Sequence, residues 1–366
     1  MKVSQSIYFG AGALLALSLT MLGGSLLAQS PTGPQSGPPP AQQSPAPQKA
    51  PDSVQQQAPQ AGVTISVDVP IVTVDVVATT QHGDIITGLK KENFRVLDDG
   101  VPQTITNFGP TDAPITMVFL MEFSSRGYNF FAARGKYWSQ YLLSNLQPKD
   151  WIALETFDMN PRIEVDFTQD KREVMEGINH LYFPGFHESN LFDAILDTMN
   201  RLKDVKGKKS IVVMASGVDT FSKHNLDQTM KLLRQSDITI FCIGLGRAYE
   251  NMTDMRGGMG NLARMDYLQA ENQLKVFAQE TGGFAWFPQF EGEMSGVFSD
   301  VAAHLRHQYS ISFSPSGGAR DGKFHKLKVE LLAADGGQFT VVDQKGKKQK
   351  YQVYAREGYQ ATKGGS

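Results

Sequence analysis

Six short apolar runs alternate with longer amphipathic stretches between residues 114 and 306, and this rhythm constrains the fold more than any other feature. The apolar runs cover residues 115–122, 151–158, 162–167, 209–216, 238–246 and 284–288. Strands that are apolar at nearly every position are buried on both faces, as in a parallel sheet that is covered by helices. The stretches between them predict helices near residues 128–146, 171–180, 189–203, 225–235, 266–281 and 291–306. We therefore expect a doubly wound, mostly parallel α/β sheet of six strands.

One edge of this sheet should depart from the parallel order. The runs at 151–158 and 162–167 are joined by only a few residues around Asn160 and Pro161. A connection between parallel strands needs a crossover of about a dozen residues, usually a helix. The third run is therefore predicted to return antiparallel to the second, as an edge strand.

The segments on either side of this region have a different pattern. Residues 63–112 and 307–360 alternate apolar and polar side chains with many β-branched residues, which is typical of half-buried strands. The pair Asp99-Gly100 is a hairpin signal. Neither segment has enough strands to cover a core alone. We expect the two to pair into one small β-sandwich, with the α/β domain of residues 113–306 inserted between them and residues 361–366 as a tail.

The N-terminal part of the chain predicts export. Residues 1–28 combine Lys2, a long apolar run and small residues up to Ala28, which is the layout of a secretory signal. A retained membrane anchor is the alternative, because the apolar run approaches the length of a span. Residues 29–62 hold nine of the 18 prolines and predict a disordered linker. We expect a periplasmic or extracellular protein that meets the membrane only through an uncleaved signal.

Composition excludes some classes of function. The net charge is −2 and no polybasic tract occurs, which argues against nucleic acid as a partner. The single cysteine, Cys242, cannot form an internal disulfide, and its place inside an apolar run predicts core packing. His304 and His307 lie three residues apart, but a third metal ligand is missing nearby. Residues 246–265 are expected to be a long loop, of which 247–264 is a candidate for partner contact.

Polar residues gather where three loops should meet at the carboxyl edge of the sheet. A doubly wound sheet binds ligands beyond the carboxyl ends of its strands. The loops are those after Glu122, before the helix near residue 189 and after Ala215. The candidate residues that they carry are Glu122, Ser124, Ser125, Arg126, His187, Glu188, Ser189, Ser216 and Asp219.

This set of loops resembles the von Willebrand factor type A domain. More narrowly, residues 65–360 are similar to a bacterial family related to that domain and abundant in acidobacteria. The resemblance is carried by "LKKENFRVLDDGVPQTITNF", "VFLMEFSS", "SNLFDAILDTM", "KSIVVMASGVDTFS", "ITIFCIGLG", "FAQETGGFAWF" and the closing "DGKFHKLKVEL" and "YAREGY". It implies a Rossmann-like α/β fold and a function in adhesion or protein binding.

The resemblance also implies a metal site, and the sequence departs from its pattern. Type A domains hold a metal, usually magnesium, with Asp-x-Ser-x-Ser in the first loop, a Thr in the second and an Asp in the third. Here the first Asp position holds Glu122, the first Ser is Ser124 and the second Ser position holds Arg126. The Thr position falls on Ser189 and the last Asp position on Ser216.

The charge at these positions argues against a bound cation. The pattern of two acids becomes one acid and one base, and a guanidinium is always charged and repels a dication at close range. We therefore expect a degenerate site without a cofactor, in which Arg126 takes the place of the ion. Magnesium or manganese bound by a variant site is the alternative, with Asp219, Glu188 or His187 as additional ligands.

These observations predict a binding module and not an enzyme. The sequence lacks a serine with a base at motif spacing, a phosphate-binding glycine loop and a Glu-x-x-His pattern. We expect an exported protein that binds another protein or a component of the cell envelope. A metal-dependent adhesion module with a variant site is the first alternative, and a hydrolase that uses Asp219 or Glu188 is the second.

Overall fold

The computed structural model describes residues 70–109, 113–125, 128–181, 184–254, 261–316, 320–342, 345–361 and 363. The predicted signal at 1–28, the predicted linker at 29–62 and the candidate Arg126 lie outside these residues. The expectations about them therefore stay predictions. Among the described residues, the helices are too short or too polar to traverse a lipid bilayer.

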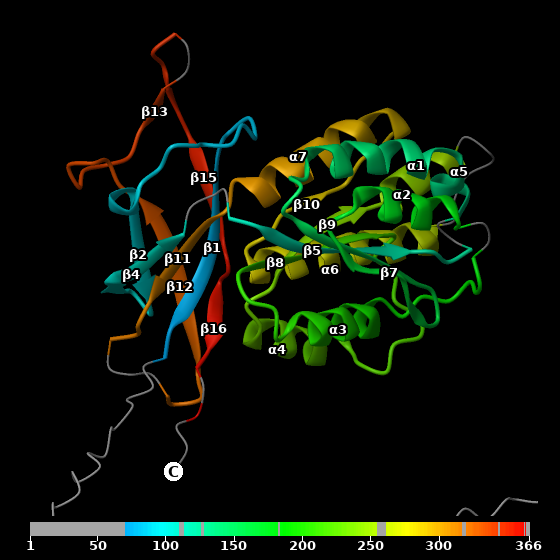
Figure 1. Cartoon of the computed structure of the whole chain (residues 1–366), viewed down its shortest axis with the longest axis horizontal. Coiled ribbons are helices and arrows are strands. Elements are labelled where there is room, and N and C mark those ends of the chain that lie inside the picture. The colour runs from blue at the N-terminus through cyan, green and yellow to red at the C-terminus, as the bar shows by residue number, and fades with distance from the viewer. Residues whose placement is uncertain are drawn as a thin grey trace, which may run out of the picture. The chain divides into compact units, whose positions relative to one another are not determined.

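A six-stranded sheet forms the centre of the α/β part (Figure 1). Its strands are β5 (Ile115–Glu122), β6 (Trp151–Phe157), β7 (Pro161–Thr168), β8 (Lys208–Ala215), β9 (Thr239–Gly244) and β10 (Ala285–Trp286). They lie in the order β10-β9-β8-β5-β6-β7, and all neighbours are parallel except β6 and β7. The doubly wound sheet and its antiparallel edge strand are thus confirmed.

Helices cover both faces of this sheet (Figure 1). They are α1 (Tyr128–Asn145), α2 (Lys171–Asn179), α3 (Leu191–Leu202), α4 (Leu226–Gln235), α5 (Gly246–Asp254), α6 (Asn261–Thr281) and α7 (Met294–Arg306). Successive side chains of a strand point to opposite faces. In β5, Phe119 and Met121 therefore pack toward α1, α2, α5 and α7, whereas Val118 and Leu120 pack toward α3, α4 and α6.

The two flanks of the chain pair with each other as antiparallel sheets. One sheet has the order β15-β1-β11-β4 and the other β16-β12-β2-β3. The strands are β1 (Val72–Thr80), β2 (Phe94–Asp98), β3 (Val101–Gln103), β4 (Ile105–Gly109), β11 (Tyr309–Phe313), β12 (Phe324–Leu331), β15 (Tyr351–Ala355) and β16 (Gly358–Gln360), beside a small hairpin of β13 (Val341–Val342) and β14 (Lys348–Gln349). Both sheets contribute to a single hydrophobic cluster. The predicted β-sandwich of N- and C-terminal flanks is confirmed.

The turn between β2 and β3 has the backbone conformation that its sequence predicts. Asp99 and Gly100 have φ angles of 47° and 83°. Two consecutive residues with positive φ match the right-handed twist of the flanking strands, as in a type I′ turn. Asp99 is the only residue other than glycine that has a positive φ in the described part of the chain.

The expected long loop at 246–265 is wrong. Residues 246–254 form α5, and α6 already begins at Asn261. Ala248 is buried, and Tyr249 and Met252 pack against the same hydrophobic cluster. This apolar face favours a helix over residues 246–254, whereas the glycines that favoured a loop lie farther along, at residues 257, 258 and 260, outside the described residues. The expectation about Cys242 holds, since its thiol is buried and burial raises its pKa.

Burial of His304 predicts a loss of stability in mild acid. Its ring lies 5.4 Å from the ring of Phe284 and 5.0 Å from that of Trp286, and Nδ1 lies 2.8 Å from the carbonyl oxygen of Asp300. Burial lowers the pKa of His304, although the contacts with Asp300 act in the opposite direction and the charge of neighbouring His307 lowers it further. At residue 304, the unfolded chain therefore binds more protons than the folded chain once the pH falls below about 6.5.

The contribution of His304 to stability should thus fall as the pH drops from about 6.5 toward its lowered pKa, by at most about 1.4 kcal/mol per pH unit. Urea unfolding at pH 7.5, 6.5 and 5.5 would measure this slope. His304→Phe, which keeps an aromatic ring against Phe284 and Trp286, should flatten it. His82→Gln is the matched control because His82 is exposed. An unchanged slope in His304→Phe would contradict the prediction.

Candidate functional site

The candidate site lies where the strand order changes direction. In the sheet, β6, which follows β5 in the sequence, lies on one side of β5, and β8 lies on its other side. The loops that leave the carboxyl ends of β5 and β8 therefore diverge, which is the position where doubly wound sheets bind ligands. Glu122 is the last residue of β5, and Ser216 directly follows β8.

Glu122 connects these two loops through both of its carboxylate oxygens. Oε1 accepts a hydrogen bond of 2.7 Å from the hydroxyl of Ser124. Oε2 accepts one of 2.7 Å from the backbone N–H of Ser216 and another of 2.7 Å from its hydroxyl. All three residues are buried. The structure thus brings Glu122, Ser124 and Ser216 together, and the carboxylate of Glu122 accepts three hydrogen bonds.

Ser189 connects the loop before α3 to the loop after β8. Its N–H donates to the hydroxyl of Thr220 at 2.9 Å, and its carbonyl oxygen accepts from the N–H groups of Thr220 at 2.8 Å and Phe221 at 3.0 Å. Its own hydroxyl is buried and makes no hydrogen bond to any described residue. Sequence reasoning missed Thr220, because a threonine in a polar loop carries no distinguishing signal.

The remaining residues of these loops are exposed at the edge of the site. The hydroxyl of Ser125 lies 3.0 Å from Nδ1 of His187, and the N–H of Ser125 donates to the carbonyl oxygen of Phe186 at 2.9 Å. His187 and Glu188 are exposed. Phe186 and Phe221 are 46% and 54% exposed, which is unusual for aromatic side chains. We call Ser125, Phe186, His187, Glu188 and Phe221 the rim.

Asp158, which sequence reasoning missed, accepts a hydrogen bond from the backbone of the rim. It follows β6 at the same edge of the sheet, and its side chain is fully buried. Its carboxylate accepts hydrogen bonds from Arg162 at 2.9 Å, from the N–H of Asn160 at 3.0 Å and from the N–H of Phe186 at 3.2 Å. Asp158 could have been found from the sequence, because an acid at the end of a buried strand is the same signal that singles out Glu122.

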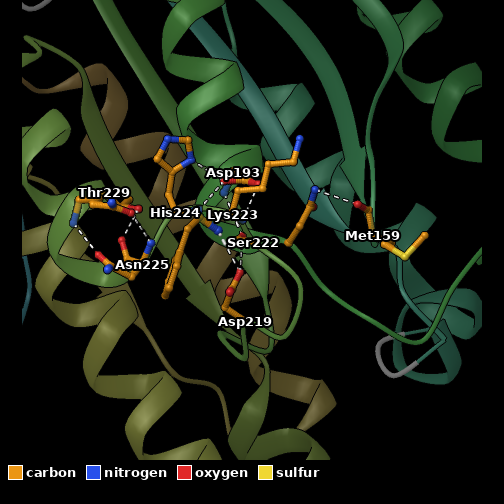
Figure 2. Close-up of polar contacts among 11 residues, drawn as sticks. Met159, Asp193, Asp219, Ser222, Lys223, His224, Asn225 and Thr229 are labelled. Carbon is orange, nitrogen blue, oxygen red and sulfur yellow. Dashed lines mark hydrogen bonds and ion pairs between the residues drawn. The ribbon is translucent and has the colours of Figure 1, made fainter.

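Asp219 belongs to a neighbouring group of polar residues and not to the Glu122 cluster. Its Oδ1 accepts from the hydroxyl of Ser222 at 2.6 Å and from the N–H of Phe192 at 3.2 Å, in the first turn of α3. Burial raises the pKa of Asp219 despite these hydrogen bonds. Figure 2 shows Ser222 between Asp219 and Asp193, whose Oδ1 lies 2.6 Å from Nδ1 of His224. No hydrogen bond or ion pair joins Asp219 to Glu122 in the described part of the chain.

Comparison with known proteins identifies the fold around this site. The family model for the von Willebrand factor type A domain matches residues 117–275. Residues 117–275 are a von Willebrand factor type A domain. The match covers β5 to most of α6, and so includes the loops that carry Glu122, Ser189 and Ser216. A search of curated proteins finds no match.

Solved structures with similarity to the chain include three of interest. A von Willebrand factor type A structure from Catenulispora acidiphila is 8% identical, with 72% of this chain and 73% of that chain covered and a TM-score of 0.43. The von Willebrand domain of the type V pili tip protein Mfa5 from Porphyromonas gingivalis is 14% identical, with 53% and 95% covered and a TM-score of 0.38. Proximal thread matrix protein 1 from the mussel byssus, with a zinc-occupied MIDAS motif, is 13% identical, with 57% and 49% covered and a TM-score of 0.40. The chain thus spans about half the length of the mussel protein.

The described residues of this type A domain fit a bound dication poorly. Mg²⁺ prefers six oxygen ligands, usually with one or two carboxylates. Glu122 is the only carboxylate among Glu122, Ser124, Ser189 and Ser216, and both of its oxygens already accept hydrogen bonds. One observation favours a bound ion: the hydroxyl of Ser189 is the one buried polar side-chain atom of the four residues that has no hydrogen-bond partner. Arg126 lies outside the described residues, so the idea that it replaces the ion stays a prediction.

Proposed function

We propose that this protein is an exported binding module whose type A domain docks another protein or an envelope component through the rim, without a metal at Glu122. Type A domains are typical of adhesion and protein-interaction modules and are generally not enzymes. The signal-like residues 1–28 support export. No helix long and apolar enough to span a membrane occurs among the described residues.

The exposed phenylalanines of the rim carry this proposal. Phe186 and Phe221 each expose about half of their surface, but the backbone around them is held by buried residues. The N–H of Phe186 donates to Asp158, and the N–H of Phe221 donates to the carbonyl oxygen of Ser189. Exposed aromatic side chains on a fixed backbone lose little conformational entropy on binding and are typical anchors of protein interfaces.

The buried residues of the site position the rim in this proposal. Glu122, Ser124, Ser189 and Ser216 are too buried to contact a partner directly. Their hydrogen bonds connect the loops after β5 and β8 and hold them in place. Asp219 caps the start of α3, which favours a structural role over the one it would have in a hydrolase.

A photo-crosslinking experiment tests the rim directly. A photoreactive residue in place of exposed Glu188 should capture a specific partner from an envelope extract of the producing cells. The matched control replaces Glu92, an exposed glutamate of the β-sandwich. Capture from position 188 should be at least tenfold stronger and should persist in EDTA. The double variant Phe186→Ser/Phe221→Ser should lose it, whereas Val101→Ser, which alters an equally exposed apolar residue, should keep it.

Two outcomes would contradict the proposal. Equal capture from positions 188 and 92 would show that the rim is not the docking surface. Capture that EDTA abolishes and Mg²⁺ or Mn²⁺ restores would favour the metal-dependent adhesion module, which the unpartnered hydroxyl of Ser189 supports.

A further inference from the structure

A second cluster of metal-ligating side chains lies in the β-sandwich, outside the type A domain. Asp98 ends β2, Asp99 begins the turn to β3, and His325 lies on β12. One ligand atom from each of the three residues lies within 4.8 Å of the others. No other group of three such side chains meets this spacing in the part of the chain that the structure describes.

The imidazole of His325 is oriented with one nitrogen toward the two aspartates. Nε2 lies 3.2 Å from Oδ1 of Asp321, and a proton on Nε2 would be donated to this carboxylate, which can only accept a hydrogen bond when it is ionised. The ring also stacks on the ring of Tyr359, with centroids 5.2 Å apart. A metal-bound histidine usually donates its other N–H to a carboxylate in this way. Nδ1 is thereby presented to Asp98 and Asp99.

Each aspartate uses one oxygen for a protein hydrogen bond and turns the other toward His325. Oδ2 of Asp98 accepts from the hydroxyl of Tyr359 at 2.9 Å, and Oδ1 of Asp99 accepts from the N–H of Lys326 at 2.9 Å. The other oxygens, Oδ1 of Asp98 and Oδ2 of Asp99, lie 3.4 Å and 3.0 Å from Nδ1 of His325. Oδ1 of Asp98 makes no hydrogen bond although the residue is only 6% exposed. A buried carboxylate oxygen without a donor is costly.

We propose that Asp98, Asp99 and His325 bind a divalent transition-metal ion, with Zn²⁺ as the best match. Tetrahedral zinc ligands lie about 2.0 Å from the ion and hence about 3.3 Å from each other. The distances of 3.0 and 3.4 Å from Nδ1 bracket this value. One imidazole and two carboxylates suit zinc better than magnesium, which prefers oxygen ligands alone. Asp99 is exposed, which leaves a path for the ion and room for a water ligand.

The ion would join segments that are far apart in the sequence. Asp98 and Asp99 belong to the N-terminal flank, whereas His325 and Asp321 belong to the C-terminal flank. The imidazole of His325 lies close to three carboxylates, those of Asp98, Asp99 and Asp321. A dication would offset most of the negative charge of these carboxylates. The competing explanation is a protonated imidazolium of His325 that pairs with the same carboxylates, and it requires no metal.

Calorimetric titration of the metal-free full chain with Zn²⁺ separates the two explanations. We expect one site whose affinity falls at least 100-fold in His325→Gln and in Asp98→Asn. Asp321→Asn, which removes only the carboxylate that orients the ring, should weaken binding about 10–100-fold. His82→Gln, the control at an exposed histidine, should leave binding unchanged. Co²⁺ should give the intense visible absorption of a tetrahedral complex in wild type and not in His325→Gln.

Three results would overturn the proposal. Absence of Zn²⁺ binding to the wild-type chain would leave the ion-paired imidazolium only. Equal binding by wild type, His325→Gln and Asp98→Asn, each shown to be folded by circular dichroism, would identify an adventitious ion only. Loss of binding in Glu122→Gln with full binding in His325→Gln would place the ion in the type A domain.

Discussion

Replacement of Asp158 by alanine should lower the free energy of unfolding by about 3 kcal/mol, the lower end of the range for breaking a buried ion pair. The carboxylate of Asp158 is fully buried, whereas Arg162 is 37% exposed and can partly regain water. Asp158→Ala also leaves the N–H groups of Asn160 and Phe186 without their acceptor. The loss should therefore exceed that of any surface ion pair of this domain.

Urea unfolding followed by tryptophan fluorescence would measure this loss. All three tryptophans, Trp138, Trp151 and Trp286, lie in the α/β part of the chain, so the signal reports on this part alone. Asp166→Ala is the matched control, because Asp166 is 78% exposed and pairs with Arg201 at the surface. It should cost less than about 1 kcal/mol. Equal losses in the two variants would show that Asp158 does not hold the loop.

The same variant should loosen the rim. The N–H of Phe186 donates to Asp158, so its hydrogen exchange should accelerate in Asp158→Ala under conditions in which the sheet stays protected. If rim rigidity supports binding, capture through position 188 should fall as well. Protection of Phe186 that equals that of wild type would contradict this link.

The α/β fold could be predicted from the sequence because its signals are redundant. The run at 115–122 coincides with β5, since all six apolar residues of that strand pack into one of the two hydrophobic clusters beneath the helices. The short link at Asn160 and Pro161 was enough to predict that β7 runs antiparallel to β6. The helix α5 was missed because its apolar face, formed by Ala248, Tyr249 and Met252, is short and is followed by a glycine-rich segment.

The candidate site was predicted only in part. Strand ends placed Glu122 and Ser216 at one edge of the sheet, and the structure joins them by hydrogen bonds. The hydrogen-bond partner of each hydroxyl depends on side-chain rotamers and loop conformation. The periodicity of the sequence predicts neither of them. For this reason the sequence did not separate Asp219, which caps α3, from the Glu122 cluster. The Asp98, Asp99 and His325 cluster joins residues more than 200 positions apart, so only strand pairing reveals it.

Restoration of the family's ligand pattern should create a magnesium site in this type A domain. In wild type, the hydroxyls of Ser124 and Ser216 and the N–H of Ser216 donate to Glu122, and a second carboxylate is missing from the aligned positions. The triple variant Glu122→Asp, Arg126→Ser and Ser216→Asp shortens the first carboxylate, removes the guanidinium and adds a carboxylate at the end of β8. Without metal it should be less stable than wild type, because two buried carboxylates repel each other.

Thermal unfolding in EDTA and in millimolar Mg²⁺ would test this reconstruction. A ligand that binds only the folded state stabilises it by about 2.7 kcal/mol at one hundred times its dissociation constant. The triple variant should therefore melt several degrees higher with Mg²⁺, and wild type should not change. Adding Ser124→Ala to the triple variant should remove the effect, since Ser124 is the hydroxyl beside the first carboxylate. A Mg²⁺-dependent rise in wild type that Glu122→Gln abolishes would show that the hydrogen bonds seen at Glu122 open to admit a metal.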